Sequence, residues 1–351
     1  MLNRRAGLYA VLLIAIASCT KQETTPITES VESTSVDQLW WPGKNQAPFP
    51  NPNPGPIEQT IFGLTQEQTL DQNTQQAVNE SIALMNEAGV DITRASITLS
   101  ETISSDIINS YLANGYEVQI LANWNGGQNG YRGFPNGWEM DEVKSRAKAF
   151  FEYYAPYKDQ IPFVAIENEW DWEVVHGSNL QDYLTELAVI TDIGHQYGFK
   201  VTDGGITSTA LQRWTYSQLS PDDQAFWIAN YFVGLNAGAI DYNTIIGIVN
   251  TFIEGVKNID IDYINMHWIN ATTCGNGFET ATQVYMEACD KKEVVCNEFC
   301  IRTSSNDLFG ETVNEIKGNA KYAIAYSGPP GGEVAIKLTD EMLYELNLNN
   351  D

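Results

Sequence analysis

One stretch of the chain, residues 180–203, reads LQDYLTELAVITDIGHQYGFKVTD. Its first part places Leu184, Leu187 and Ala188 on one face of a helix, because apolar residues recur there at a spacing of three or four. Gly198 then ends the helical pattern, and a short run of aromatic and β-branched residues follows. The stretch therefore predicts a helix, a glycine turn and a strand, in that order.

The same unit recurs along the chain. Gly89 and Gly115 each stand between a helical pattern and a β-rich run. Eight strands are predicted in this way, at Ile61–Gly63, Ile92–Ile97, Val118–Ala122, Phe163–Ile166, Lys200–Asp203, Tyr263–Met266, Val294–Cys296 and Tyr322–Ala325. The last strand has an alternative in Val334–Leu338, and we favour Tyr322–Ala325.

Strands that alternate with helices pair in parallel, because each crossover between parallel strands needs a connecting helix. Eight repeats within the roughly 295 residues that follow residue 56 predict a single α/β domain, a closed (β/α)₈ TIM barrel, rather than an open doubly wound sheet. No glycine-rich phosphate motif follows the first predicted strand, which argues against a dinucleotide-binding fold.

The amino terminus has the features of an export signal. Arg4 and Arg5 precede a short apolar run, Leu8–Ala17, which is too short to span a bilayer. The segment Ile16-Ala17-Ser18-Cys19 resembles the lipobox of bacterial lipoproteins. That resemblance implies a signal peptide over residues 1–19, lipidation of Cys19, and a protein of the bacterial cell envelope anchored to the outer membrane, facing the periplasm or the cell surface. The alternative is an ordinary signal peptide with a chance cysteine.

Residues 20–56 are rich in Thr and Ser and then in Pro, and they are expected to be a tether before the barrel domain at residues 57–351. The formal net charge of −26 argues against nucleic acid or an anionic membrane surface as a partner, because phosphate binding needs clustered Lys and Arg. The membrane would be reached through the lipid anchor alone.

No cofactor and no metal are expected, because the three histidines show no paired ligand spacing. Four cysteines follow the lipobox: Cys274, Cys289, Cys296 and Cys300. Export permits disulfides, and four cysteines allow three full pairings. Cys296 and Cys300 are expected on one strand about 13 Å apart, which is too far for a disulfide, and a bridge between Cys274 and Cys300 stays open.

Function in such a barrel is expected at the carboxyl ends of the strands. Glu169 follows the fourth predicted strand and Glu298 the seventh. Cleavage of a glycosidic bond needs such a pair, one carboxylic acid to protonate the leaving oxygen and one carboxylate to attack. Arg94, on the second strand, would favour the charged form of Glu298. Glu167 competes with Glu169 for the acid role, because alternate residues of a strand share a face.

Both glutamates lie in motifs that resemble those of the clan A glycoside hydrolases. Asn168-Glu169 matches the Asn-Glu pair that ends strand four in that clan, and Glu298-Phe299 matches its glutamate and aromatic residue after strand seven. The resemblance implies that Glu169 is the acid/base, that Glu298 is the nucleophile, and that Asn168 binds the sugar 2-hydroxyl. It also implies a double displacement that retains the anomeric configuration.

Further residues resemble the binding subsites of the clan. His267-Trp268 is similar to a His-aromatic pair after strand six, and Arg94 falls where family 5 has an arginine. The chain departs from the pattern at Trp170, where a proline is common, and at Trp124, in a segment where family 5 has a histidine. The expected substrate-binding residues are Arg94, Asn125, Asn168, His267, Trp268, Trp124 and Trp170.

We therefore expect a retaining β-glycosidase, endo-acting on a polysaccharide or oligosaccharide. The departures from the clan pattern leave a second hypothesis, a non-catalytic glycan-binding lipoprotein on a barrel scaffold. A transglycosylase that uses the same residues is a third.

Overall fold

A computed structural model describes residues 57, 59–66, 75–124, 140–175, 179–230, 241–270, 277–290, 292–301, 305–328 and 337–350. Eight parallel strands form one sheet in the order β1-β8-β7-β6-β5-β4-β3-β2. They are β1 (Ile61–Gln66), β2 (Ile92–Thr98), β3 (Glu117–Asn123), β4 (Val164–Ile166), β5 (Val201–Asp203), β6 (Tyr263–Asn270), β7 (Glu293–Ile301) and β8 (Tyr322–Ser327). All eight predicted strands are confirmed, and Tyr322–Ser327 is the eighth.

The sheet is nearly closed. β1 and β2 stand at its two ends, and they approach each other at Gly63. A Cβ atom on Gly63 would lie 2.6 Å from the carbonyl oxygen of Ile92, so only glycine fits there. The predicted (β/α)₈ barrel is confirmed.

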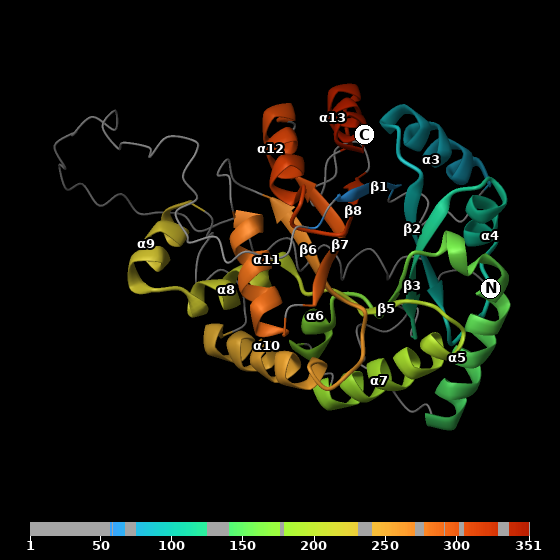
Figure 1. Ribbon diagram of the computed structural model, residues 1–351, viewed down its shortest axis with the longest axis horizontal. Helices are drawn as coiled ribbons and strands as arrows, with labels where there is room; N and C mark the ends of the chain where they lie inside the picture. Colours follow the sequence, from blue (N-terminus) through green and yellow to red (C-terminus); the bar gives the residue numbers. More distant parts are fainter. Residues whose placement is uncertain are drawn as a thin grey trace, which may run out of the picture.

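Helices surround the strands (Figure 1). They are α3 (Gln75–Ala88), α4 (Asp106–Ala113), α5 (Met140–Tyr154), the 3₁₀ helix η2 (Ala155–Gln160), α6 (Trp170–Val175), α7 (Leu180–Gln196), α8 (Ser208–Gln218), α9 (Pro221–Asn230), α10 (Tyr242–Val256), α11 (Gly277–Ala288), α12 (Asn306–Ile316) and α13 (Asp340–Asn350). Side chains of Ser105, Asn179, Thr207, Asp241 and Ser305 accept hydrogen bonds from backbone N–H groups in the first turns of α4, α7, α8, α10 and α12.

The glycine turns are as the sequence predicts. Gly89, Gly115 and Gly198 have φ angles of 62°, 86° and 80°, in the left-handed region that glycine enters without steric cost. Each ends a helix and turns the chain into the next strand, which sets the repeating helix–strand unit.

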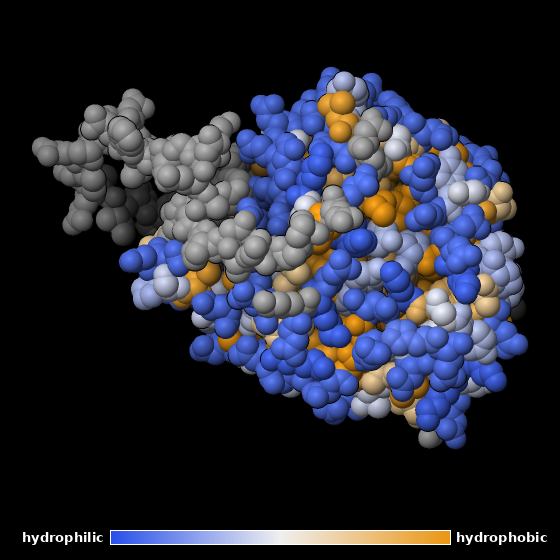
Figure 2. All heavy atoms as spheres, viewed as in Figure 1, coloured by the Kyte–Doolittle hydropathy of each residue, from blue (hydrophilic) through white to orange (hydrophobic). Residues whose placement is uncertain are grey.

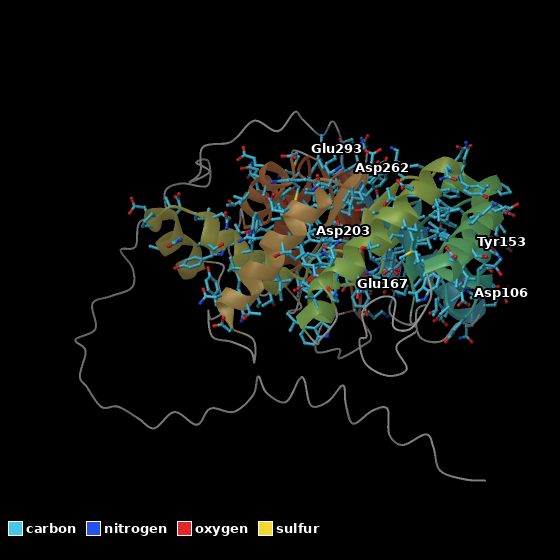
Figure 3. The ribbon with its side chains drawn as sticks, turned by 90° about the horizontal axis from the view of Figure 1, so that it is seen from below. Asp106, Tyr153, Glu167, Asp203, Asp262 and Glu293 are labelled. Atoms are coloured by element: carbon cyan, nitrogen blue, oxygen red, sulfur yellow. The ribbon has the colours of Figure 1, made fainter. Side chains whose placement is uncertain are left out.

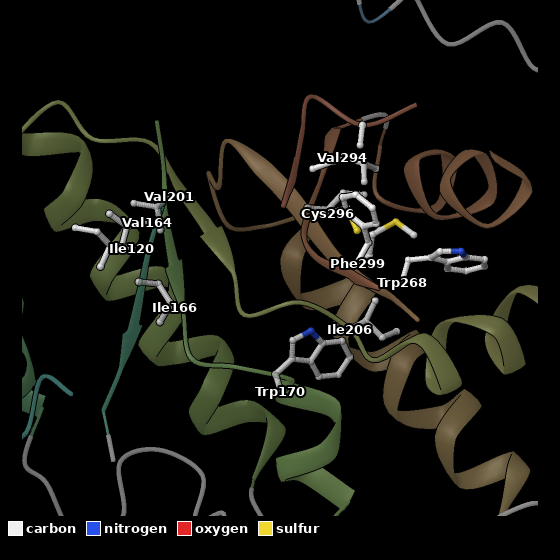
Figure 4. Packing of buried hydrophobic residues seen from close by; sticks show 14 of the residues in the cluster. Ile120, Val164, Ile166, Trp170, Val201, Ile206, Trp268, Val294, Cys296 and Phe299 are labelled. Atoms are coloured by element: carbon white, nitrogen blue, oxygen red, sulfur yellow. The ribbon is translucent and has the colours of Figure 1, made fainter. Parts of the chain in front are cut away.

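Side chains inside the barrel form an apolar layer at the amino-terminal ends of the strands, where Phe163, Tyr263, Val295 and Tyr322 pack together. Outside the barrel, Ile120, Val164, Ile166 and Val201 belong to the core between strands and helices (Figure 4). Toward the carboxyl ends of the strands, beyond this apolar layer, buried polar residues lie on β2, β6 and β7 and in the turn that follows β4.

The two ends of the barrel are separated in Figure 3. Glu293 and Asp262, at the amino-terminal ends of β7 and β6, lie at the upper edge, whereas Glu167 and Asp203, at the carboxyl ends of β4 and β5, lie below them. Polar side chains dominate the face shown in Figure 2. In the part of the chain described, no helix has the length and apolarity to cross a membrane. Cys19, the tether and the boundary at residue 56 lie outside the described residues and stay predictions.

Candidate active site

The chain that leaves β4 has an unusual backbone. Glu167 and Glu169 have φ angles of 64° and 50°, which side-chain-bearing residues seldom adopt. Two hydrogen bonds hold this turn, from the Glu167 N–H to the Ala122 carbonyl and from the Glu169 N–H to the Gly204 carbonyl, each 3.0 Å long. Such strained residues persist where the surrounding structure fixes them, often at functional sites.

The two glutamates of this turn differ in their environment. Glu167 is buried, and its Oε1 accepts a 2.6 Å hydrogen bond from the backbone N–H of Trp124. The Glu169 side chain retains 26% of its exposure, and its Oε1 lies 3.1 Å from Nδ1 of His267. Glu167 therefore ties β4 to the end of β3, while Glu169 faces the barrel mouth.

A β-bulge turns Glu298 toward the same point. Val295 faces the barrel interior, so strict alternation along β7 would give Asn297 the next interior position. The register instead shifts on both sides of β7, between Asn265/His267 and between Cys296/Phe299, and Glu298 becomes the partner of His267. One extra residue in the strand thus presents Glu298 instead of Asn297.

Arg94 joins the two strand ends. Its guanidinium is 3% exposed; Nη1 donates to Glu298 Oε2 at 2.5 Å, and Nη2 donates to Asn168 Oδ1 at 2.6 Å. Because one planar group binds both side chains, Arg94 fixes the nucleophile candidate relative to the Asn-Glu motif of β4.

The charges around Glu298 and His267 shift both of their pKa values. Burial raises the pKa of Glu298, but the positive charges of His267 and Arg94 outweigh it, and the net pKa is lower than usual. Burial lowers the pKa of His267, but the charge of Glu298 and the hydrogen bond and charge of Glu169 outweigh it, and the net pKa is raised. Glu298 is therefore ionised at neutral pH.

The two carboxylates lie close together. Nδ1 of His267 is 3.1 Å from Glu169 Oε1 and 4.0 Å from Glu298 Oε2, so these oxygens are at most about 7 Å apart. Retaining glycosidases hold their carboxyl groups about 5–5.5 Å apart and inverting ones about 6.5–9.5 Å. The upper limit of about 7 Å for the distance between Glu169 Oε1 and Glu298 Oε2 is compatible with the separation in retaining enzymes. It overlaps only the lowest part of the range found in inverting enzymes.

The three tryptophans expected to stack on sugar are buried. Trp124 is fully buried, Trp268 is 2% exposed and packs edge-on against Phe278, and Trp170 is 1% exposed. Trp170 stacks on Phe252 of α10 with ring centroids 3.9 Å apart. These rings present no open face to a sugar in this structure, and the expected substrate binding by the three tryptophans stays a prediction. Asn125, also expected to bind substrate, lies outside the described residues.

Several polar residues of the site region have no counterpart in the sequence-based hypothesis. Asp203 at the end of β5 is fully buried, and its carboxylate accepts hydrogen bonds from the N–H groups of Gly205 and Asn265. Asp171, two residues after Glu169, is also buried and accepts two hydrogen bonds from Thr207. The only sequence signal for either was a carboxylate near a predicted strand end.

Two glycines bring β5 close to its neighbours. A Cβ atom on Gly204 would lie 2.5 Å from the Glu167 carbonyl oxygen. Gly205 has φ of 85°, and a Cβ atom there would lie 2.7 Å from Nε2 of His267. The Gly-Gly pair therefore lets the backbone just after β5 pack directly against the turn after β4 and against His267.

Among the described residues, no group of three or more His, Cys, Asp or Glu side chains is arranged to hold a metal ion. Cys289 and Cys296 are buried free thiols, and burial raises the pKa of each. Cys274 lies outside the described residues, so any pairing of that cysteine stays a prediction. The described site thus offers carboxylates, an imidazole and a guanidinium.

Known structures share this architecture. Exo-β-1,4-mannosidase Op5Man5 from Opitutaceae bacterium strain TAV5 superposes on 83% of this chain with a TM-score of 0.51 and 10% identity, over 59% of its own length. A glucosidase from Croceicoccus marinus does so on 82%, with a TM-score of 0.53 and 11% identity, over 64% of its length. XacCel5A, solved with cellopentaose, covers 82% of this chain at a TM-score of 0.54 and 9% identity, over 98% of its length.

The chain shares the eight-stranded barrel fold of these three proteins. It spans less than two thirds of the length of the mannosidase and the glucosidase and nearly all of XacCel5A. No protein-family model and no curated protein matches the sequence. At these identities the likeness establishes the fold, and the chemistry is argued from the site itself.

Proposed function

We propose that the protein is a retaining glycoside hydrolase with Glu298 as nucleophile and Glu169 as acid/base. The observation that carries the proposal is the position of His267 Nδ1, which lies within 4.0 Å of a carboxylate oxygen of both glutamates at the carboxyl end of the barrel. The lowered pKa of Glu298 supports its role, because a nucleophile must be ionised when substrate binds.

In the first step, a Glu298 oxygen attacks the anomeric carbon while Glu169 gives its proton to the leaving glycosidic oxygen. The glycosidic bond breaks, and a covalent glycosyl–Glu298 ester forms. In the second step, the Glu169 carboxylate takes a proton from water, and the water oxygen displaces Glu298 from the anomeric carbon. Two inversions at one carbon give net retention.

Arg94 and His267 act on the charges that change during this cycle. Arg94 holds Glu298 in one orientation and, through Asn168, fixes the turn that carries Glu169. His267 hydrogen-bonds to Glu169, so its N–H stabilises the carboxylate that Glu169 becomes once it has lost its proton. Both groups are buried, where such interactions are stronger than in water.

The proposed substrate is a β-linked polysaccharide or oligosaccharide, with endo action. The names of two fold neighbours support a β-linked glycan as the substrate, since one is named as an exo-β-1,4-mannosidase and another was solved with cellopentaose.

We further propose that the protein is tethered to the bacterial outer membrane through lipidated Cys19. Incorporation of labelled palmitate into the wild-type protein, and its loss in Cys19→Ala, would test the anchor.

The central experiment compares wild type with Glu298→Gln on a panel of β-glucans, mannans, xylans and galactans. Wild type is expected to release new reducing ends, and the variant is expected to bind the same glycan without hydrolysing it, because the amide is not nucleophilic. NMR of the first product formed should show the β-anomer.

Other outcomes point elsewhere. Sustained glycan binding by wild type without new reducing ends would favour a binding lipoprotein, and products longer than the substrate would favour a transglycosylase. Full hydrolysis by Glu298→Gln would remove Glu298 from the mechanism, and an inverted product would exclude retention.

A further inference from the structure

The residue two positions after Glu169 is connected to the rest of the site through α8. Asp171 is 5% exposed, and both of its carboxylate oxygens are bound by one residue, Thr207. The backbone N–H of Thr207 donates to Oδ1 at 2.8 Å, and its hydroxyl donates to Oδ2 at 2.6 Å. The turn that carries Glu169 is therefore fixed to the chain segment between β5 and α8.

Thr207 is also the N-cap of α8. Its Oγ accepts a 3.3 Å hydrogen bond from the Ala210 N–H while its own proton goes to Asp171. The hydroxyl thus acts as acceptor toward the helix and donor toward the carboxylate. A side chain without this hydroxyl loses both bonds at once.

The next residue extends the connection to β6. Ser208 Oγ donates to the His267 carbonyl at 3.0 Å and accepts from the Ile269 N–H at 2.6 Å. Thr207 and Ser208, at the amino-terminal end of α8, hence bind the Glu169 turn on one side and the His267 backbone on the other.

Packing around Asp171 supports the same arrangement. Trp170, between Glu169 and Asp171, stacks on Phe252 of α10 and on Tyr183 of α7. Trp170 and Ile206, the residue before Thr207, are among the packed side chains of Figure 4. Because Glu169 has positive φ, its orientation depends on such anchors rather than on its own backbone preference.

We propose that Asp171 is a positioning residue for Glu169: through Thr207 and Ser208 it fixes the distance between the Glu169 carboxylate and the His267 imidazole. This inference rests on the proposed glycosidase function. Asp171 does not touch substrate; it acts through the turn that carries the acid/base. Burial raises the pKa of Asp171 to about 6, although the hydrogen bonds from Thr207 favour its charged form.

Leaving-group dependence separates this role from a purely structural one. A dinitrophenyl glycoside departs with little help from an acid, whereas a disaccharide needs Glu169 to protonate its leaving oxygen. A misplaced Glu169 should therefore lower kcat/KM for the disaccharide and leave kcat/KM for the dinitrophenyl glycoside of the same sugar nearly unchanged. A loss of folded protein would lower both equally.

Asp171→Ala removes both hydrogen bonds of the connection, Thr207→Val removes the hydroxyl bond and keeps the one from the backbone N–H, and Thr207→Ser keeps both. Thr60→Val is the matched control, because Thr60 is a buried threonine whose hydroxyl binds the Ala320 carbonyl at the opposite end of the barrel. We expect Asp171→Ala and Thr207→Val to lose about tenfold or more in kcat/KM on the disaccharide and less than about twofold on the dinitrophenyl glycoside. Thr207→Ser should match wild type, and Thr60→Val should change only the melting temperature.

Equal losses on the two substrates, or no loss on either, would overturn the positioning role. If Asp171→Ala does not fold, Thr207→Val against Thr207→Ser still decides the question. A wild-type protein that hydrolyses no glycoside would instead contradict the proposed function, so the two failures are distinguishable.

Discussion

Arg94 donates a 2.5 Å hydrogen bond from Nη1 to Oε2 of Glu298, and this buried ion pair links β2 to the bulge of β7. The contact orients the carboxylate and, together with His267, holds the pKa of Glu298 below its usual value despite burial.

Replacing Arg94 with alanine should raise the pKa of Glu298, because burial then acts against the charge of His267 alone. The acidic limb of the pH profile of kcat/KM should move to higher pH, and the maximal rate should fall about a hundredfold or more. Arg146→Ala is the control, since Arg146 hydrogen-bonds to the Leu99 carbonyl from α5. A pH profile in Arg94→Ala that superposes on that of Arg146→Ala would contradict the prediction.

Replacing Glu169 with alanine should remove the acid/base and leave the nucleophile. A dinitrophenyl glycoside should still form the glycosyl–Glu298 ester, and added azide should accelerate turnover and yield the β-glycosyl azide, because the anion attacks without needing a base. Glu167→Gln retains the acceptor for the Trp124 N–H, and azide should not affect its rate. If azide accelerates Glu167→Gln and not Glu169→Ala, then Glu167 is the acid/base and Glu169 is not.

Replacing Gly205 with alanine should displace His267. The substitution places a side chain at φ of 85°, which costs about 1–2 kcal/mol, and its Cβ would lie 2.7 Å from Nε2 of the imidazole. Gly115→Ala is a matched control, because Gly115 has φ of 86° and a Cβ there would meet nothing within 4 Å. Both variants should melt at lower temperature, and only Gly205→Ala should lose most of its activity. Equal activities of Gly205→Ala and Gly115→Ala would contradict the prediction that a side chain at residue 205 displaces the His267 imidazole.

Replacing Asp203 with asparagine should change how stability depends on pH. Burial raises the pKa of Asp203 to about 7, although the N–H groups of Asn265 and Gly205 favour its charged form. Because the folded protein holds this proton more tightly than the unfolded chain, the contribution to stability is full below about pH 4 and is lost as pH rises to about 7. The difference in unfolding free energy between wild type and Asp203→Asn should therefore shrink over that range.

Urea denaturation at several pH values measures this difference, with Asp222→Asn on α9 as an exposed control. A difference between wild type and Asp203→Asn that is constant from pH 4 to pH 7 would refute the assignment of the raised pKa.

The amino-acid sequence by itself determined the alternation of helices and strands and the turns between them. The helical spacing before Gly198 and the β-rich run after it are local patterns, and a local pattern is enough to specify an element and its end. Parallel pairing was then expected, because helices connect the successive strands, and in such a barrel the site is expected at the carboxyl ends of the strands. Glu169, Glu298 and Arg94 were named from their places on or after the predicted strands, and Asn168 and His267 from the resemblance to clan A motifs. The structure brings all five together.

Only the tertiary structure decided which side chain at each strand end faces the barrel mouth. The alternation rule left Glu167 and Glu169 as competitors, and the positive φ angles after β4 give them different directions. The same rule does not foresee the bulge that presents Glu298, nor the burial of Trp170 against Phe252. Nothing local links Asp171 to Thr207, 36 residues further on. These features depend on register and close packing between segments distant in sequence, so they become fixed only when the barrel closes.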